Sequence, residues 1–203
     1  ATQKLLVENS TIHNCQGYGL TISYAKVQVY NTQISNTLNH CLYVEGGHVD
    51  VNNSTIAQFY PFDGNRRSAI GFKAPIDTLD VRNSLVTGYG NDEVLWTPVE
   101  EEPLKFSFDH CVLRTEKMMT EDSLRFTHVV YEDVKDTTMY GEKHFSVFDT
   151  ENLIYDFHLS AKSAAIGAAD PKTALPYDRN GLKREEDKAD AGCFLYREEK
   201  KEE

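Results

Sequence analysis

An eight-residue pattern recurs along the first half of the chain, and it constrains the fold more than any other feature. The pattern is an apolar residue, any residue, an apolar residue, any residue, Asn, Ser or Thr, any residue, and an apolar residue. Four copies begin at Leu5, Val27, Val49 and Leu79. Successive Asn residues are 22, 22 and 30 positions apart, and a degenerate fifth copy carries His110 after a further 27. Self-similarity of this length indicates a protein built from stacked structural repeats.

Each of the first four copies is followed by a second apolar segment. These segments are Gly19–Ile22, Cys41–Val44, Ala69–Phe72 and Glu93–Trp96. Alternation of apolar and polar residues predicts short strands with one buried face, and the unit is too short for a propeller blade. We therefore predict an all-β fold, a right-handed single-stranded parallel β-helix with coils of about 22 residues over residues 1–115.

The repeated Asn has a physical reason in such a fold. Each coil must bend sharply after a strand, and Asn tolerates left-handed backbone angles. We expect a structural Asn ladder in which stacked side chains also hydrogen-bond from coil to coil. Its members are Asn9, Asn31, Asn53 and Asn83. His110, which replaces the fifth Asn, is expected to be a turn residue rather than a catalyst.

Two insertions interrupt the repeat, within residues 58–67 and 97–103, and insertions in a solenoid loop outward. In the first, Tyr60, Phe62, Arg66 and Arg67 are candidate substrate-binding residues, because aromatic rings stack on sugars and Arg binds carboxylates. Lys73 follows shortly after, and the three basic residues are weak catalytic candidates. The alternative, which the sequence favours, is a loop whose aromatic side chains fold back over the coil edge while its arginines are solvated.

Other signatures of catalysis or metal binding are few. The chain lacks G-x-S-x-G, H-E-x-x-H and phosphate-binding Gly motifs, and its seven histidines show no metal-ligand spacing. Asp63, Asp77, Asp80 and Asp92 come from neighbouring coils, and such carboxylates can bind Ca²⁺. Asp63 and Asp77 are the weak candidate ligands. Apart from this calcium ion, no cofactor is expected.

The repeat is lost after Leu113. Residues 116–196 are predicted to hold the last coil or coils, with one strand expected within Phe126–Tyr131, and then a non-repeating cap. A cap covers the apolar end and the unpaired strand edges of the last coil. Residues 197–203 form a charged tail.

Short phrases in residues 145–196 carry a family resemblance. They lie at Phe148–Asp149, Asp156–Leu159, Ser163–Ala168, Asp178–Arg184 and Asp190–Gly192. Together they resemble the C-terminal part of secreted bacterial right-handed parallel β-helix proteins of the pectate-lyase-like, choice-of-anchor type. Ala164 departs from the Pro that members usually have, and Cys193–Leu195 departs from their usual ending. The resemblance implies the fold and secretion, while the family includes both enzymes and proteins without known activity.

Net charge, hydropathy and cysteine content exclude several classes of protein. A net charge of −11 argues against a nucleic-acid binder, which needs a basic face, and no apolar run is long enough to span a bilayer. Four cysteines without C-x-x-C spacing favour buried thiols over a disulfide framework, although three full pairings stay open. The repeat begins at Leu5 without a signal peptide, so we expect upstream β-helix coils in a longer, secreted or cell-surface protein.

Two functions are compatible with these features. The first is an extracellular or cell-surface module that binds polysaccharide or serves as a structural spacer, without a complete active site in this segment. The second is the C-terminal half of a polysaccharide lyase or hydrolase-like enzyme acting on acidic glycans. A lyase needs a base and a cation that neutralises the uronate carboxylate, for which only Arg66, Arg67 and Lys73 are available beside Ca²⁺.

Overall fold

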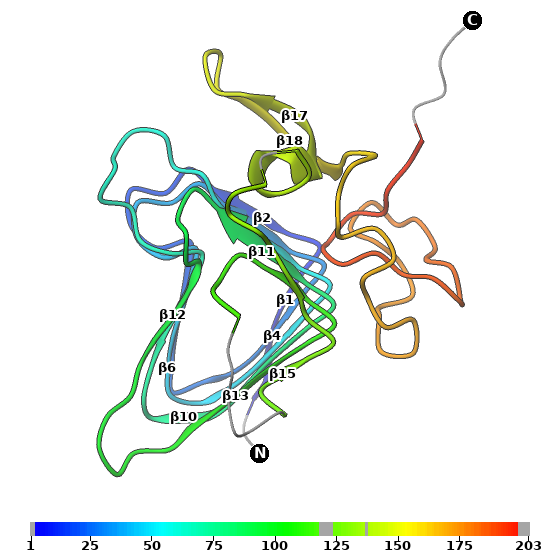
Figure 1. Ribbon diagram of the computed structural model, residues 1–203. Coiled ribbons are helices and arrows are strands. Elements are labelled where there is room, and N and C mark those ends of the chain that lie inside the picture. The colour runs from blue at the N-terminus through cyan, green and yellow to red at the C-terminus, as the bar shows by residue number, and fades with distance from the viewer. Residues whose placement is uncertain (1–2, 118–123, 137, 199–203) are drawn as a thin grey trace, which may run out of the picture.

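The computed structural model describes residues 3–117, 124–136 and 138–198. Its first part is built from three parallel sheets, which Figure 1 shows as the sides of a triangular prism. Sheet A contains, in spatial order, β1 (Leu5–Glu8), β4 (Lys26–Tyr30), β7 (His48–Asn52), β10 (Ile76–Arg82), β13 (Leu104–Asp109) and β15 (Phe126–Thr127). Sheet B contains β2 (Thr11–His13), β5 (Gln33–Ser35), β8 (Thr55–Gln58), β11 (Leu85–Gly88), β14 (Val112–Leu113) and β16 (Val130–Tyr131). Sheet C contains β3 (Leu20–Ser23), β6 (Leu42–Glu45), β9 (Ile70–Lys73) and β12 (Val94–Thr97).

The predicted all-β parallel β-helix is confirmed, with about five turns. Each of the first four coils has three strands, because the bend at Asn divides the eight-residue pattern between sheets A and B and the second apolar segment forms the strand in sheet C. The strands β15 and β16 extend both sheets beyond residue 115, so a further coil lies where the repeat is no longer visible in the sequence.

Stacking brings equivalent residues of the repeat into register and forms the core. Val29 pairs with Val51, which in turn pairs with Val81, and all three side chains are fully buried. The residues between them point outward, as alternation along a strand requires. Burial of each such side chain contributes about 1.5–3 kcal/mol, so the repeated apolar positions provide much of the stability of the solenoid.

The bend between sheets A and B has the same backbone conformation in every coil. The residues at the bend have φ of 50° at Asn9, 44° at Asn31, 46° at Asn53, 50° at Asn83, 50° at His110 and 52° at His128. Left-handed angles of this kind are most accessible to Asn among the non-glycine residues. His110 is therefore a bend residue, and His128 occupies the same position one coil later.

Hydrogen bonds along the stack come mainly from the residue after each bend. This column contains Ser10, Thr32, Ser54 and Ser84, and then Cys111. The backbone N–H of Thr32 donates to Ser54 Oγ at 3.3 Å, and the N–H of Ser54 donates to Ser84 Oγ at 3.1 Å. The Asn side chains behave differently from the expected ladder, because most of their contacts are with the C-terminal part of the chain.

The C-terminal part begins with the short 3-10 helix η1 (Gly141–His144) and the antiparallel hairpin of β17 (Phe145–Asp149) and β18 (Ile154–Leu159). Residues 160–196, here called the C-terminal segment, have little regular structure and lie beside the corner between sheets A and B (Figure 1). Asn31 Nδ2 donates to the carbonyl of Tyr177 at 2.9 Å, and Asn83 Oδ1 accepts the N–H of Asp170 at 2.8 Å. These contacts are on the side of the solenoid, and a cover over the end of the last coil stays a prediction.

The four cysteines are free thiols. Cys41, Cys111 and Cys193 are buried, whereas Cys15 is partly exposed. Burial raises the pKa of the Cys41 and Cys111 thiols to about 12, so both are protonated at neutral pH. Among the described residues, no helix has the length and apolarity needed to cross a bilayer. Of the charged tail expected at 197–203, residues 199–203 lie outside the described residues.

Candidate functional site

The first insertion forms a loop of residues 59–69 between β8 and β9, at the corner between sheets B and C. Phe59 and Tyr60 are buried, and the Phe59 ring packs edge-on against Tyr89 with centroids 4.9 Å apart. Phe62 is 65% exposed and touches only the edge of the Tyr60 ring among its aromatic neighbours. Two of the three aromatic side chains therefore cover the solenoid, and Phe62 alone is available to a ligand.

The three basic residues of this region have different neighbours. The Arg66 guanidinium lies over the Tyr89 ring, 4.9 Å from its centroid. The backbone N–H of Arg67 donates to the carbonyl of Leu38, which fixes the loop to the preceding coil. Lys73 Nζ is 3.6 Å from Glu45 Oε1 on the outer face of sheet C. The described contacts thus do not gather these cations around one point.

The four aspartates considered for calcium also have separate partners. Asp63 accepts from the N–H of Asn65, and Asp77 pairs with His48. Asp80 accepts from the Ser107 hydroxyl, and Asp92 accepts from the Thr115 hydroxyl. Asp63 lies in the loop at the corner between sheets B and C, whereas Asp77 lies on β10 in sheet A. Within the described residues, the one group of three potential metal ligands is located elsewhere.

An aromatic cluster that the sequence did not single out lies beside the loop 59–69. It consists of Tyr18, His40 and Tyr43, here called the aromatic cluster. The Tyr18 and Tyr43 ring centroids are 5.3 Å apart, and the His40 and Tyr43 rings stack at 5.5 Å. Tyr18 and His40 occupy the same position in successive coils, so the period of 22 residues could have revealed the pair.

His40 joins the aromatic cluster to the loop. Its Nδ1 is 2.9 Å from Ser68 Oγ, at the end of the loop, and burial lowers the pKa of the imidazole. The ring lies directly over Gly71, where an added Cβ would be 2.5 Å from the nearest His40 atom. Only glycine leaves room for the imidazole there, and Tyr18 is 43% exposed. The arrangement therefore presents aromatic surface to solvent at a corner of the solenoid.

The outer face of sheet A is polar. Tyr30 donates to Asp50 Oδ2 at 2.5 Å, and Arg82 donates to Asp50 Oδ1 at 2.7 Å. Burial, together with the hydrogen bond to Asp50, raises the pKa of Tyr30 to about 12. These side chains form a hydrogen-bonded row from β4 to β10 and leave Asp109, on the next strand, to other partners.

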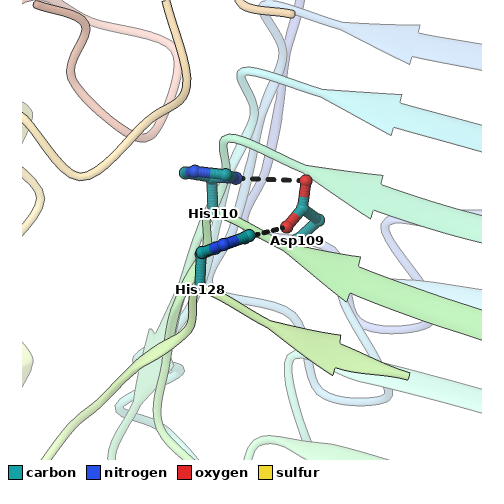
Figure 2. Close-up of side chains that lie close together, drawn as sticks. All are labelled: Asp109, His110 and His128. Carbon is teal, nitrogen blue, oxygen red and sulfur yellow. Dashed lines mark hydrogen bonds and ion pairs between the residues drawn. The ribbon is translucent and has the colours of Figure 1, made fainter. Parts of the chain in front are cut away.

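Asp109, His110 and His128 meet at the last two bends between sheets A and B, as Figure 2 shows. Asp109 Oδ1 is 3.0 Å from His128 Nδ1, and Asp109 Oδ2 is 3.1 Å from His110 Nδ1. The two imidazoles stack with centroids 4.3 Å apart. Burial alone raises the pKa of Asp109, but the hydrogen bonds from Thr127 and His128 and the charge of His110 outweigh it and lower the pKa.

A second histidine network is wholly internal. His144 Nδ1 is 2.8 Å from Ser163 Oγ, and His144 Nε2 is 3.1 Å from Glu132 Oε1. Glu132 also accepts from Arg114 at 2.9 Å. The order Ser, His, Glu matches an acyl-transfer site, but the side chains of His144 and Glu132 are fully buried. A substrate cannot reach side chains that are fully buried. The network instead links His144 and Ser163 of the C-terminal part with Glu132 and Arg114 of the solenoid.

Comparison of the chain with protein-family models, with curated proteins and with solved structures finds no match. On the surface that the structure describes, the aromatic cluster and the group Asp109, His110 and His128 each bring together side chains that can bind a ligand.

Proposed function

We propose that the chain is a polysaccharide-binding module of a secreted or cell-surface protein, and that it binds glycan at the aromatic cluster and the adjoining loop 59–69. The observation that carries this proposal is the contiguous ring cluster of Tyr18, His40 and Tyr43, in which Tyr18 is exposed and the other two rings are partly buried. Aromatic faces bind the apolar faces of sugar rings, and such contacts need no catalytic group. The cluster spans two adjacent coils, which lie about 4.8 Å apart, so its rings are spaced along the solenoid axis.

The loop adds groups that favour acidic sugars. Phe62 offers a second exposed ring, and Arg67 lies next to Ser68, which contacts His40. Guanidinium groups bind carboxylates through paired hydrogen bonds. A local positive charge is required for an acidic glycan, because the chain as a whole carries a charge of −11.

The proposal of a larger solenoid is supported at the first coil. Leu5 and Leu6 on β1 are 58% and 49% exposed, and β1 pairs with β4 on one side. An exposed strand with apolar side chains is a surface for further strands. We therefore propose that upstream β-helix coils of the same protein pack against β1. The resemblance of residues 145–196 to secreted bacterial pectate-lyase-like proteins supports an extracellular location.

No observation favours the lyase alternative. A lyase would need a base beside a cation that binds the uronate carboxylate. Lys73 is paired with Glu45 and Arg66 is stacked on Tyr89, so these two residues do not form such a pair. Binding without catalysis therefore explains the described surface with fewer requirements.

The test compares glycan binding of the chain with that of Tyr43→Ala and Tyr18→Ala. Loss of one stacking ring is expected to weaken binding about tenfold, since aromatic contacts of this kind contribute about 1–1.5 kcal/mol. Tyr177→Ala is the matched control, because Tyr177 is comparably exposed and its described hydrogen bond uses only the backbone carbonyl. A glycan array with neutral and acidic polysaccharides, followed by calorimetry on the best ligand, measures the effect.

The results of this test distinguish a wrong binding surface from a wrong function. Equal affinity of all three variants would show that glycan binds elsewhere, and the absence of any bound glycan would contradict the function. Ultraviolet absorbance of unsaturated uronates, measured with and without added Ca²⁺ on the same acidic polymers, would reveal a lyase.

A further inference from the structure

The bend between sheets A and B changes its chemistry in the last two coils. Asn occupies the left-handed position in the first four coils, and His occupies it at 110 and 128. Parallel pairing of β13 with β15 places Thr127 beside Asp109, so His128 follows directly over His110. Histidine has no advantage over Asn in left-handed backbone, and its appearance at two successive bends beside one carboxylate therefore calls for another reason.

The contacts within the group leave binding capacity unused. Thr127 donates to Asp109 Oδ1 at 2.6 Å, which orients the carboxylate. His110 Nδ1 is buried and faces Asp109 Oδ2 at 3.1 Å, an ion-pair distance, without a hydrogen bond of good geometry. Buried polar atoms in native proteins are nearly always paired, and the carboxylate is the partner of this nitrogen, so an ion bound between them would be ligated by both.

The neighbouring cation does not fill this role. Arg82 is opposite Asp109 in the register of β10 and β13, but its guanidinium is directed to Asp50 on the other side, at 2.7 Å. Asp109 therefore keeps its negative charge for the two imidazoles. Each histidine has a ring nitrogen directed at a different oxygen of the same carboxylate.

The separations suit a metal ion. One potential ligand atom from each residue lies within 4.8 Å of the other two. In tetrahedral sites, Zn–N and Zn–O bonds of about 2.0–2.1 Å place neighbouring ligand atoms about 3.3 Å apart, close to the 3.0 and 3.1 Å between Asp109 and the two imidazoles. Two imidazoles and a carboxylate are preferred by zinc and other late transition metals, whereas calcium and magnesium prefer oxygen ligands alone.

We propose that Asp109, His110 and His128 bind one divalent transition-metal ion of the Zn²⁺ type. Thr127 supports the carboxylate from behind, as second partners of metal ligands commonly do. Three protein ligands leave at least one coordination position for water or for an oxygen of a bound molecule. The site is independent of the aromatic cluster and does not require that the chain bind glycan.

The experiment is a calorimetric titration of the tag-free chain with Zn²⁺, with bound metal counted after dialysis by elemental analysis. We expect one ion per chain, and a loss of affinity of at least about tenfold in His110→Asn and in His128→Asn. Asn is the residue that the other coils use at this bend, so both variants are expected to fold. Co²⁺ serves as a spectroscopic probe, and its visible absorption in the wild-type chain should be absent from the double variant.

The controls make the assignment falsifiable. His13→Asn removes an exposed histidine on β2 and should leave Zn²⁺ affinity unchanged. A thermal melt gives a second readout, because Zn²⁺ that binds the folded state should raise the Tm of the wild-type chain but not of the double variant. Absence of Zn²⁺ binding, equal binding by the double variant, or preferential binding of Ca²⁺ would each overturn the proposal.

Discussion

The two corners at the ends of sheet B are held together by different chemistry. At the corner between sheets A and B, uncharged amides of Asn31, Asn53 and Asn83 bind the backbone of the C-terminal segment. At the corner between sheets B and C, one buried carboxylate, Glu93, accepts from the N–H of Ala69 at 2.7 Å and of Gly90 at 2.6 Å. The first corner repeats one contact in several coils, while the second depends on a single ionisable group.

The comparison of the two corners indicates where the sequence of a solenoid can vary from coil to coil. The corner between sheets A and B has the same bend in each coil, and the C-terminal segment covers it at Asn31, Asn53 and Asn83. The corner between sheets B and C bears the loop 59–69 and the aromatic cluster, and its geometry depends on side chains that occur once. The corner that varies most along the chain is therefore also the one at which we propose that glycan binds, since loops on a rigid scaffold commonly bind ligands.

The largest effect is expected from pH, which should distinguish the corners directly. Burial raises the pKa of Glu93 to about 8, against 4.5 in the unfolded chain. Between these values the unfolded state loses a proton that the folded state keeps, so the stability contributed by this group is complete below pH 4.5 and falls as pH rises to 8. Between pH 5 and 8 the loss amounts to at most about 4 kcal/mol.

Urea denaturation at pH 5 and pH 8 measures this loss, with Glu93→Gln as the comparison. The variant should lack the component of the pH dependence that belongs to Glu93. If the wild-type chain and Glu93→Gln lose equal stability between the two pH values, Glu93 is ionised throughout and the corners do not differ in this respect.

An intermediate effect is expected from Asn83→Ala at the corner between sheets A and B. The buried Asn83 amide accepts from Asp170 N–H and donates to Asn52 Oδ1 at 2.9 Å. Loss of these bonds, together with alanine in left-handed backbone, should lower the free energy of unfolding by about 3 kcal/mol.

Asn9→Ala is its internal control. Asn9 has the same φ of 50° but is exposed, so the variant should lose only about 1–2 kcal/mol from backbone strain. Chemical denaturation of both variants gives the difference, which measures the Asn83 side-chain bonds to the C-terminal segment and to Asn52. Equal losses would mean that these side-chain bonds add nothing to the stability of the bend.

The smallest stability effect, with a functional consequence, is expected from Gly71→Ala. The new methyl group would overlap the His40 ring, which must move because it is partly exposed and the strand is not. We expect a loss of about 1–2 kcal/mol in stability, within the range for overpacking, and weaker glycan binding through a displaced aromatic cluster. Thermal denaturation and calorimetry measure the two effects, and undiminished glycan affinity would separate His40 from the binding surface.

The fold could be predicted from the sequence because each coil has the same local requirements. Alternating apolar residues predict the strands, and Asn at a constant spacing predicts the bend. The placement of the C-terminal segment could not be predicted, since it depends on pairs such as Asn31 and Tyr177, which are 146 residues apart. The Asn residues recur periodically, but the residues of the C-terminal segment that they bind do not.

The aromatic cluster and the group Asp109, His110 and His128 could not be predicted from the sequence, for related reasons. His110 was visible as a departure from the repeat, but its partner His128 follows after 18 residues in a segment where the pattern is no longer legible. The aromatic cluster combines residues 18, 40 and 43, whose proximity follows only when two coils are stacked. By contrast, Tyr60 belongs to an obvious insertion and is buried, so an aromatic residue in a loop was a weaker indicator than its position in the coil.

The C-terminal segment has a consequence for how the molecule unfolds. A stack of coils in which each unit touches only its neighbours can fray from either end, because loss of one coil exposes only the next. Here one continuous length of chain is bonded to Asn31, Asn53 and Asn83, which belong to three successive coils. Separation of any one of these coils must also detach the segment from the others. The central coils are thereby coupled into a single cooperative unit, and fraying is confined to the ends of the solenoid.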